Sequence, residues 1–322
     1  MRELLRPYVY KLGNCDEVKV FEAGNSPVIV FVNKVNSHRE VQVDRFSSDY
    51  KVDKKVVTQH NVLDKDSWGF LLSMNLDLIL RLMKNPKKVG DDYYAENPFT
   101  VSEAYQFQEI LYDLKDSKRF DTRKHFKFVN TGTIEKYFFL WSIKPTTYLK
   151  KKYHTPVADR DVFQKNFTKR FSQMRVSKIV ISGMRHFECA LDMSGDVIAG
   201  KSTVILKSKG NTDLISVLTI LNSSLITFFI KEAFGVLGIG GGINFTAELV
   251  ENLPLSKVND REQRKLESLF NDILKIVGRD NWSNNAENQA KVREYEKQID
   301  QMVYKLYGLT EEEIKIVEGE TA

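Results

Sequence analysis

The hydrophobic pattern of the N-terminal part predicts two strands, a polar stretch and then a helix. Strands are expected at Lys19–Phe21 and at Val28–Val32, where five consecutive apolar residues (VIVFV) are typical of a strand buried on both faces. The polar stretch 41–65 predicts a connector or an exposed meander. At 71–83, apolar residues at helical spacing indicate a helix that Pro86 prevents from continuing.

Short β-type runs dominate the middle of the chain, between Lys127 and Leu206. These runs are FKFV, KIVISGM, FECALD, VIAG and STVILK, and they are separated by Gly, Asn and Asp. We therefore expect the middle region to be mainly strand.

Helical periodicity returns in the last third of the chain. A helix is predicted at Asp213–Phe234, and its apolar part holds three Ser, two Thr and one Asn, which favours a buried core helix over a membrane span. An amphipathic helix is expected to begin near Asn259, and a third helix to stop at Gly308 in a left-handed cap. Thr310 and Glu313 form a capping-box pattern that starts a fourth helix.

Length and composition predict a folded protein with one large or two ordinary domains. The chain has 322 residues, of which 42% are hydrophobic and 28% are charged. Only Cys15 and Cys189 are present, too few for a disulfide framework or a cysteine zinc site, so a cytoplasmic location is expected. The five histidines have no ligand spacing, so we expect no metal, and the N-terminus lacks the apolar core of a signal peptide.

Positive charge is concentrated between Arg123 and Lys178. This segment holds fourteen Lys or Arg against three acids, a net charge of +11, whereas the whole chain carries +5. Eleven aromatic residues are interleaved with these cations, and the sharpest local feature is YLKKKY at Tyr148–Tyr153. A continuous cationic face of this kind is what binding to nucleic-acid phosphates requires. For any single residue of this segment, the alternative is that the charged side chain is only solvated and that the aromatic side chain belongs to the core.

Three motifs have the form of a catalytic or nucleotide-binding element without its context. Gly195–Ser202 (GDVIAGKS) matches a phosphate-binding loop, but the strand signal TVILK follows it where a helix is required, which favours a β-hairpin. Gly238–Asn244 (GIGGGIN) follows a helix instead of a strand, so a close backbone approach, for example to DNA, is the alternative. Asn97–Phe99 lacks the second proline of the Asn-Pro-Pro-aromatic tetrapeptide of amino methyltransferases and predicts a turn. No catalytic residue is identified.

Several segments, taken in order, carry a resemblance to a known family. The runs FKFVNTGTIEKYFFLW, TTYLKKKYHTPV and KIVISGMRHFECALDMSGDVIAGKST resemble the target-recognition region of the TaqI-like and type IIG adenine-specific DNA methyltransferases of restriction-modification systems. LNSSLITFFIKE, GGGINFTAELVENLPL and IDQMVYKLYGLTEEEIKIVEG resemble the C-terminal end of the same family. The resemblance covers residues 90–318, and residues 1–34 are similar to the last part of its methyltransferase domain.

The resemblance implies an α+β fold with three parts. Residues 1–60 would be a short remnant of a methyltransferase α/β sheet, 61–256 a mainly β target-recognition domain, and 257–322 a C-terminal helical segment that packs on the recognition domain. Phe21 corresponds to the aromatic residue that stacks on the flipped adenine in the family, although Gly24-Asn25-Ser26 replaces the Thr-Thr-Tyr that follows it there.

The family's S-adenosylmethionine loop and its Asn-Pro-Pro-aromatic tetrapeptide precede the matched region and do not occur in this sequence. The resemblance therefore implies that this chain binds duplex DNA, while a separate catalytic polypeptide, or another part of a longer gene product, binds the cofactor and transfers the methyl group. The candidate DNA-contacting residues are Lys144, Tyr148, Lys150, Lys151, Lys152, Arg170, Arg175, Lys178, Arg185 and Lys201.

Two further interpretations remain open from the sequence. One is a complete methyltransferase or nuclease with degenerate motifs, which S-adenosylmethionine binding by the isolated chain would favour. The other is a specificity or protein-interaction subunit without DNA binding, which an absence of salt-dependent DNA binding would favour.

Overall fold

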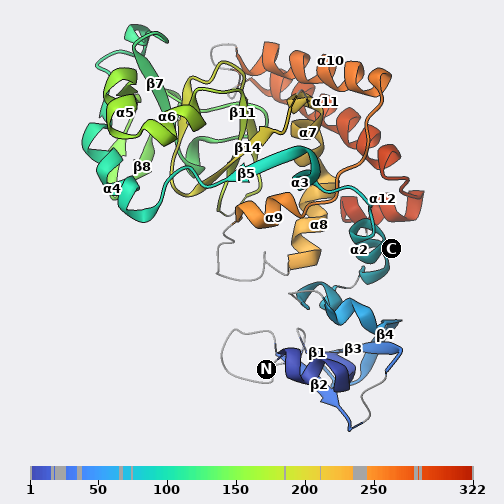
Figure 1. The fold of residues 1–322 in the computed structure, drawn as a ribbon. Helices are drawn as coiled ribbons and strands as arrows, with labels where there is room; N and C mark the ends of the chain where they lie inside the picture. The colour runs from blue at the N-terminus through green and yellow to red at the C-terminus, as the bar shows by residue number, and fades with distance from the viewer. Residues whose placement is uncertain are drawn as a thin grey trace. The chain divides into compact units, whose positions relative to one another are not determined.

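The chain has an α+β fold that divides into two compact units, Met1–Met83 with Phe229–Gly241, and Lys84–Phe228 with Gly242–Ala322. A computed structural model of the chain is shown in Figure 1. It describes residues 2–15, 18, 27–34, 38–64, 68–73, 75–184, 186–210, 212–234, 245–278, 282 and 285–320.

The first unit is built on a four-stranded sheet with the order β2-β1-β3-β4. Strand β1 pairs antiparallel with β2 and parallel with β3, and β3 and β4 form an antiparallel hairpin, so the stretch 41–65 is not a connector. The predicted exposure holds for β4 and is wrong for β3, where Val41 and Val43 are buried. The strands are β1 (Val9–Asn14), β2 (Val28–Val32), β3 (Glu40–Phe46) and β4 (Val52–Gln59). The helical segments are α1 (Arg2–Leu5), η1 (Arg6–Tyr8), η2 (His60–Asp64), η3 (Gly69–Leu72) and α2 (Leu76–Met83).

Strand β2 has the predicted bounds but not the predicted burial. It lies at the edge of the sheet, and Val28, Ile29, Val30 and Val32 are between 39% and 46% exposed. The prediction that both of its faces are buried is therefore wrong for this chain. An apolar run indicates what a strand can bury, but it does not indicate whether a second neighbouring strand is present. The strand expected at Lys19–Phe21 lies outside the described residues.

The second unit contains two four-stranded sheets and one two-stranded hairpin. The sheet orders are β13-β7-β10-β6 and β12-β11-β14-β5, and the hairpin is β8-β9. All five predicted β-type runs form strands, β7, β11, β12, β13 and β14. The strands are β5 (Tyr93–Glu96), β6 (Tyr112–Asp113), β7 (His125–Val129), β8 (Thr146–Tyr148), β9 (Lys151–Tyr153), β10 (Pro156–Asp159), β11 (Lys178–Ser182), β12 (Cys189–Asp192), β13 (Val197–Ala199) and β14 (Thr203–Ser208).

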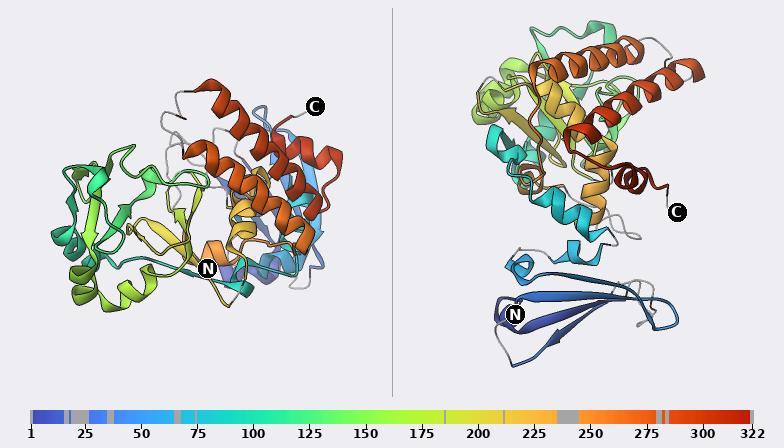
Figure 2. Two further views of the ribbon diagram at one scale, coloured as in Figure 1. Left: turned by 90° about the horizontal axis from the view of Figure 1, so that it is seen from above. Right: turned by 90° about the vertical axis from the view of Figure 1, so that its right-hand side faces the viewer.

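Helices cover the outer surfaces of the second unit. Helix α7 packs on β11 and β12, and α10 and α11 pack on α7, so the C-terminal helices lie against the strand region as expected (Figure 2). Helices α5 and α6 were not predicted, and they interrupt the mainly strand region. The helices are α3 (Val89–Asp92), α4 (Val101–Ile110), η4 (Ser117–Arg119), η5 (Thr131–Thr133), α5 (Arg160–Asn166), α6 (Thr168–Met174), α7 (Leu214–Leu221), α9 (Ala247–Glu251), α10 (Asp260–Val277), α11 (Ala286–Leu306) and α12 (Glu311–Glu318). Helix α8 (Ser224–Phe234) spans the division between the two units.

The predicted boundaries of the C-terminal helices are confirmed. The Asn259 side chain accepts from the backbone N–H groups at the start of α10, as an N-cap residue should. Gly308 follows α11 with φ of +63°. Thr310 and Glu313 form the predicted capping box at the start of α12.

The single helix predicted at Asp213–Phe234 is instead two helices, α7 and α8, whose axes are 58° apart. At the break, the Asn222 side-chain amide bonds to the backbone N–H and carbonyl of Cys189, at 2.9 and 2.8 Å. The Asp300 carboxylate then accepts from the backbone N–H and hydroxyl of Ser224, at 2.7 Å each, and caps α8. Within the described residues no single helix is long and apolar enough to cross a membrane, and α7 with α8 meets that test only as a bent pair.

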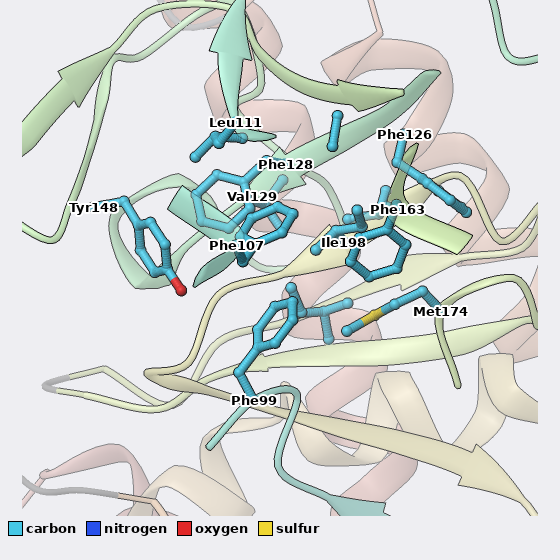
Figure 3. Close-up of a cluster of buried hydrophobic side chains, with 14 of the residues drawn as sticks. Phe99, Phe107, Leu111, Phe126, Phe128, Val129, Tyr148, Phe163, Met174 and Ile198 are labelled. Atoms are coloured by element: carbon cyan, nitrogen blue, oxygen red, sulfur yellow. The ribbon is translucent and has the colours of Figure 1, made fainter. Parts of the chain in front are cut away.

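An aromatic core fills the space between the two four-stranded sheets of the second unit (Figure 3). Phe126 and Phe128 extend into it from β7. Phe107 extends into it from α4, and Phe99 from the residue before the N-cap of that helix. The rings of Phe99 and Phe107 are stacked at 4.9 Å, and Phe163 of α5 meets Phe107 edge-on at 5.7 Å. Most aromatics of the basic segment therefore stabilise the core and do not face a ligand.

A buried ion pair crosses from β11 to β12 in the same unit. Lys178 is 0% exposed, and its ammonium donates to the Asp192 carboxylate and to the Met174 carbonyl. Asp192 also accepts from the backbone N–H groups of Asp196 and Val197, at 3.1 and 3.0 Å. Burial lowers the pKa of Lys178, and the Asp192 charge opposes that shift. Lys178 therefore stabilises the fold, and its predicted role as a phosphate contact is wrong.

The aromatic core predicts a large difference between two neighbouring residues of α4. Phe107→Ala should lower the free energy of unfolding by about 3–5 kcal/mol, because a 0% exposed ring is replaced by a cavity. Tyr105→Ala on the same helix should change it by less than about 0.5 kcal/mol, because that ring is 60% exposed. Urea unfolding followed by circular dichroism measures both, and equal losses would contradict the assignment of Phe107 to the core.

The buried ion pair predicts unequal effects of removing its two partners. Asp192→Ala should cost about 3–5 kcal/mol of unfolding free energy, because it leaves the Lys178 charge buried without its carboxylate. Lys178→Met should cost less, about 1–3 kcal/mol, because Asp192 keeps two backbone donors. The same urea titration tests this order, and a larger loss for Lys178→Met would be evidence against it.

Candidate nucleic-acid interface

The β8–β9 hairpin separates a buried face from an exposed one. Thr146 pairs with Tyr153, and the side chains of both are buried together with that of Tyr148. Thr147 pairs with Lys152 on the opposite face, where both side chains are exposed. Because side chains alternate across a strand, burial of the two tyrosines directs Lys152 outward.

The turn of this hairpin is held in a strained conformation by α4. Leu149 and Lys150 have φ of +44° and +70°, the left-handed region that side chains enter at a cost of about 1–2 kcal/mol per residue. The Gln108 side chain donates to the carbonyl oxygens of Tyr148 and Leu149, at 2.8 and 3.2 Å. These bonds fix the turn, so the exposed Lys150 and Lys151 are displayed on a defined backbone.

The turn between β13 and β14 lies beside the hairpin and adds one more cation. The Asn130 side-chain amide donates to the Thr147 carbonyl at 3.2 Å, and a Cβ at Gly200 would lie only 2.4 Å from the Asn130 side-chain oxygen. The Tyr148 hydroxyl lies beside the backbone of the exposed Lys201. We call the four exposed cations of this hairpin and the neighbouring turn the hairpin cluster: Lys150, Lys151, Lys152 and Lys201.

The motif Gly195–Ser202 is a strand between two turns and forms no phosphate loop. A strand, β14, follows Ser202, as predicted, but the predicted β-hairpin is wrong because β13 and β14 belong to different sheets. Gly195 has φ of +67°, and a Cβ there would lie 2.3 Å from the Arg175 carbonyl oxygen. This glycine is therefore required by close packing of two backbones.

The fourteen cations of the basic segment do not form one continuous face. Four of them are bound by the protein's own carboxylates: Arg123 by Asp121, Arg160 by Asp196, Arg170 by Glu103 and Lys178 by Asp192. Arg170, a predicted phosphate contact, donates to both oxygens of Glu103 and holds the pKa of that carboxyl at about 2. These four cations are not available to phosphates, so the predicted face is wrong in extent. Of the others, Lys124, Lys165 and Lys169 are exposed elsewhere in the segment, and the three lysines of the YLKKKY run lie together on the hairpin.

The other candidate residues lie apart from that cluster. Tyr148 is buried against Phe128, at 4.8 Å between ring centroids, so its role is to position the hairpin and not to contact DNA. Arg175 is exposed, but it lies beyond the opposite end of β13 from Lys201. Burial raises the pKa of Glu188, and the charge of the exposed Lys144 opposes that rise, so Lys144 lies near an acid. Three predicted features lie outside the described residues: Phe21, Arg185 and Gly238–Asn244.

Sequence reasoning missed Gln108 of α4, which contacts the turn of the hairpin. Gln108 fixes the turn, and Tyr105, one helical turn earlier, is 60% exposed. The available signal was the helical spacing of the buried Ala104 and Phe107, which leaves Tyr105 and Gln108 outside the core.

The Asn97–Phe99 segment takes part in the packing of the second unit. Asn97–Phe99 is the predicted turn: the Asn97 carbonyl accepts from Arg170 and Gln173, and Phe99 points into the aromatic core. Over the described part of the chain, no three His, Cys, Asp or Glu side chains are grouped so that they could hold a metal ion. The chemistry available to the hairpin cluster is the binding of anions by lysine ammonium groups.

The comparisons with known proteins give one weak structural similarity. No protein-family model matches the chain, and no curated protein matches it. Among solved structures, the chain is similar to the type IIG restriction endonuclease BpuSI, with 11% sequence identity and a TM-score of 0.37. The match covers 95% of this chain and 45% of that protein, so the chain spans less than half of its length.

Proposed function

We propose that this chain binds duplex DNA through the hairpin cluster, as the target-recognition part of an adenine-specific DNA methyltransferase of a restriction-modification system. The observation that carries the DNA assignment is the cluster itself. Its four lysines are exposed, and none of them forms an ion pair with a carboxylate among the residues that the structure describes, although the Lys151 ammonium lies 5.1 Å from the Tyr153 ring centroid. Clustered free ammonium groups neutralise backbone phosphates and release their counterions. The adenine-methyltransferase assignment is supported by the sequence resemblance.

In this proposal the chemistry lies outside this chain. S-adenosylmethionine would require a glycine loop between a buried strand and a helix, and the described motif Gly195–Ser202 leads from strand to strand instead. The motif Gly195–Ser202 therefore does not supply such a loop. We assign cofactor binding and methyl transfer to a separate catalytic polypeptide or to another part of a longer gene product, and stacking on the extruded adenine to Phe21.

Replacing the hairpin lysines tests the DNA assignment. The triple variant Lys150→Gln, Lys151→Gln and Lys152→Gln should weaken binding to duplex DNA at every sequence. It should also reduce the slope of log affinity against log salt by up to about 3, since each phosphate contact contributes about 0.9. Fluorescence anisotropy with a labelled duplex over a salt series measures both quantities.

The matched control removes the same charge from the C-terminal helices. Lys265, Lys297 and Lys305 are exposed along the groove between α10 and α11, where Glu262 and Glu294 also lie. Their triple replacement by Gln should leave the salt slope unchanged. Equal losses in both triple variants would show only a net-charge effect. Failure of the unaltered chain to bind DNA at low salt would overturn the proposal in favour of a protein-interaction subunit.

A further inference from the structure

A cavity of about 320 Å³ lies in the second unit, where three segments of the chain meet. These are the segment from Lys87 to the start of β5, the first two turns of α7 and the stretch that leads into α10. Hydrogen bonds join the segments: the Tyr93 hydroxyl donates to the Asp213 carbonyl at 2.6 Å, and the Leu255 N–H donates to the Lys87 carbonyl at 3.0 Å. The cavity is therefore a preformed part of the fold, as ligand sites usually are.

The Ser216 side chain lines this cavity with an unsatisfied polar group. The residue is 5% exposed, and its hydroxyl is buried and has no hydrogen-bond partner among the residues that the structure describes. The polar neighbours on its helix bond to its backbone instead: the Thr219 hydroxyl donates to the Ser216 carbonyl, and the Asp213 carboxylate accepts from the Ser216 N–H. A buried hydroxyl without a partner costs free energy, which a ligand atom in the cavity would offset.

The charges around the cavity balance except for one. Lys87 and Asp92 form an ion pair at 2.5 Å. The Asp213 carboxylate accepts from two backbone N–H groups at the start of α7, at 2.8 and 2.9 Å. Lys257 is exposed and forms no ion pair with the residues that the structure describes. A ligand that complements this cavity therefore carries one negative charge, as a carboxylate does and a doubly charged phosphate does not.

Part of the cavity wall is apolar. Val217, Ile220 and Leu255 line it, and they are 1%, 1% and 5% exposed. Contact of such side chains with hydrocarbon is more favourable than contact with water. At about 30 Å³ for each water-sized group, the cavity holds about ten non-hydrogen atoms. The volume and this wall together favour a small ligand with an apolar body.

We propose that this cavity binds a small carboxylate with an apolar body, of about ten non-hydrogen atoms in all. The carboxylate accepts from the Lys257 ammonium, and the Ser216 hydroxyl donates to a ligand oxygen. The apolar body lies against Val217 and Ile220. The hairpin cluster takes no part in this site, so the inference does not depend on the proposed DNA binding.

Two probes of equal size and shape test the inference: 3-phenylpropanoate and its neutral amide, 3-phenylpropanamide. Titration of the isotopically labelled full chain, followed by NMR, measures the affinity of each probe and locates it. The carboxylate should shift the backbone signals of residues 213–217 and 255–258, and the amide should bind about 5-fold more weakly because it lacks the charge. Shifts confined to other parts of the chain, or equal affinities, would overturn the inference.

Three variants assign the contacts. Lys257→Gln should remove the advantage of the carboxylate over the amide, whereas Lys265→Gln, at an exposed position of α10 outside the cavity, should preserve it. Ser216→Ala should weaken binding of both probes by about 5-fold. The same variant should raise the thermal unfolding midpoint of the free chain by about 2–4 °C, because it removes a buried hydroxyl without a partner. Either an unchanged affinity or a lowered midpoint for Ser216→Ala counts against the site.

Discussion

Burial of Tyr148 and Tyr153 is the constraint on which the candidate interface depends. Their rings anchor one face of a short hairpin to the aromatic core, and strand alternation then directs Lys152 on the other face into solvent. Lys150 and Lys151 are exposed at the turn. The same core holds Phe107 of α4, and α4 carries Gln108 to the strained turn. Hydrophobic packing thus positions the charges, and the hydrogen bonds of Gln108 fix a turn whose left-handed backbone conformation costs free energy.

Elements with local signals could be predicted from the sequence, whereas features that depend on distant partners could not. Asn259 and Thr310 bond to backbone groups within their own helical turn, so their motifs define helix starts without further information. The break between α7 and α8 depends on Cys189 and Asp300, which lie far from it in sequence. Periodicity alone therefore predicted one helix where there are two.

The candidate site shows the same division between local and distant information. The YLKKKY run was sufficient to predict an exposed group of lysines, and three of the four members of the hairpin cluster come from it. The charge count of the basic segment overestimated its cationic surface, because the acids that neutralise Arg170 and Lys178 are Glu103 and Asp192, both outside that segment. Lys201 joined the cluster through a backbone contact that no linear count could include.

The central claim is that DNA lies on the hairpin and its neighbouring turn, and lysine modification measures this most directly. An amine-acylating reagent applied to the chain with and without duplex DNA, followed by mass spectrometry, reports the accessibility of each ammonium group. The account predicts that DNA protects Lys150, Lys151, Lys152 and Lys201, while the exposed lysines of α10 and α11 stay reactive. Protection of the α10 and α11 lysines, with the hairpin cluster still reactive in the complex, would contradict it.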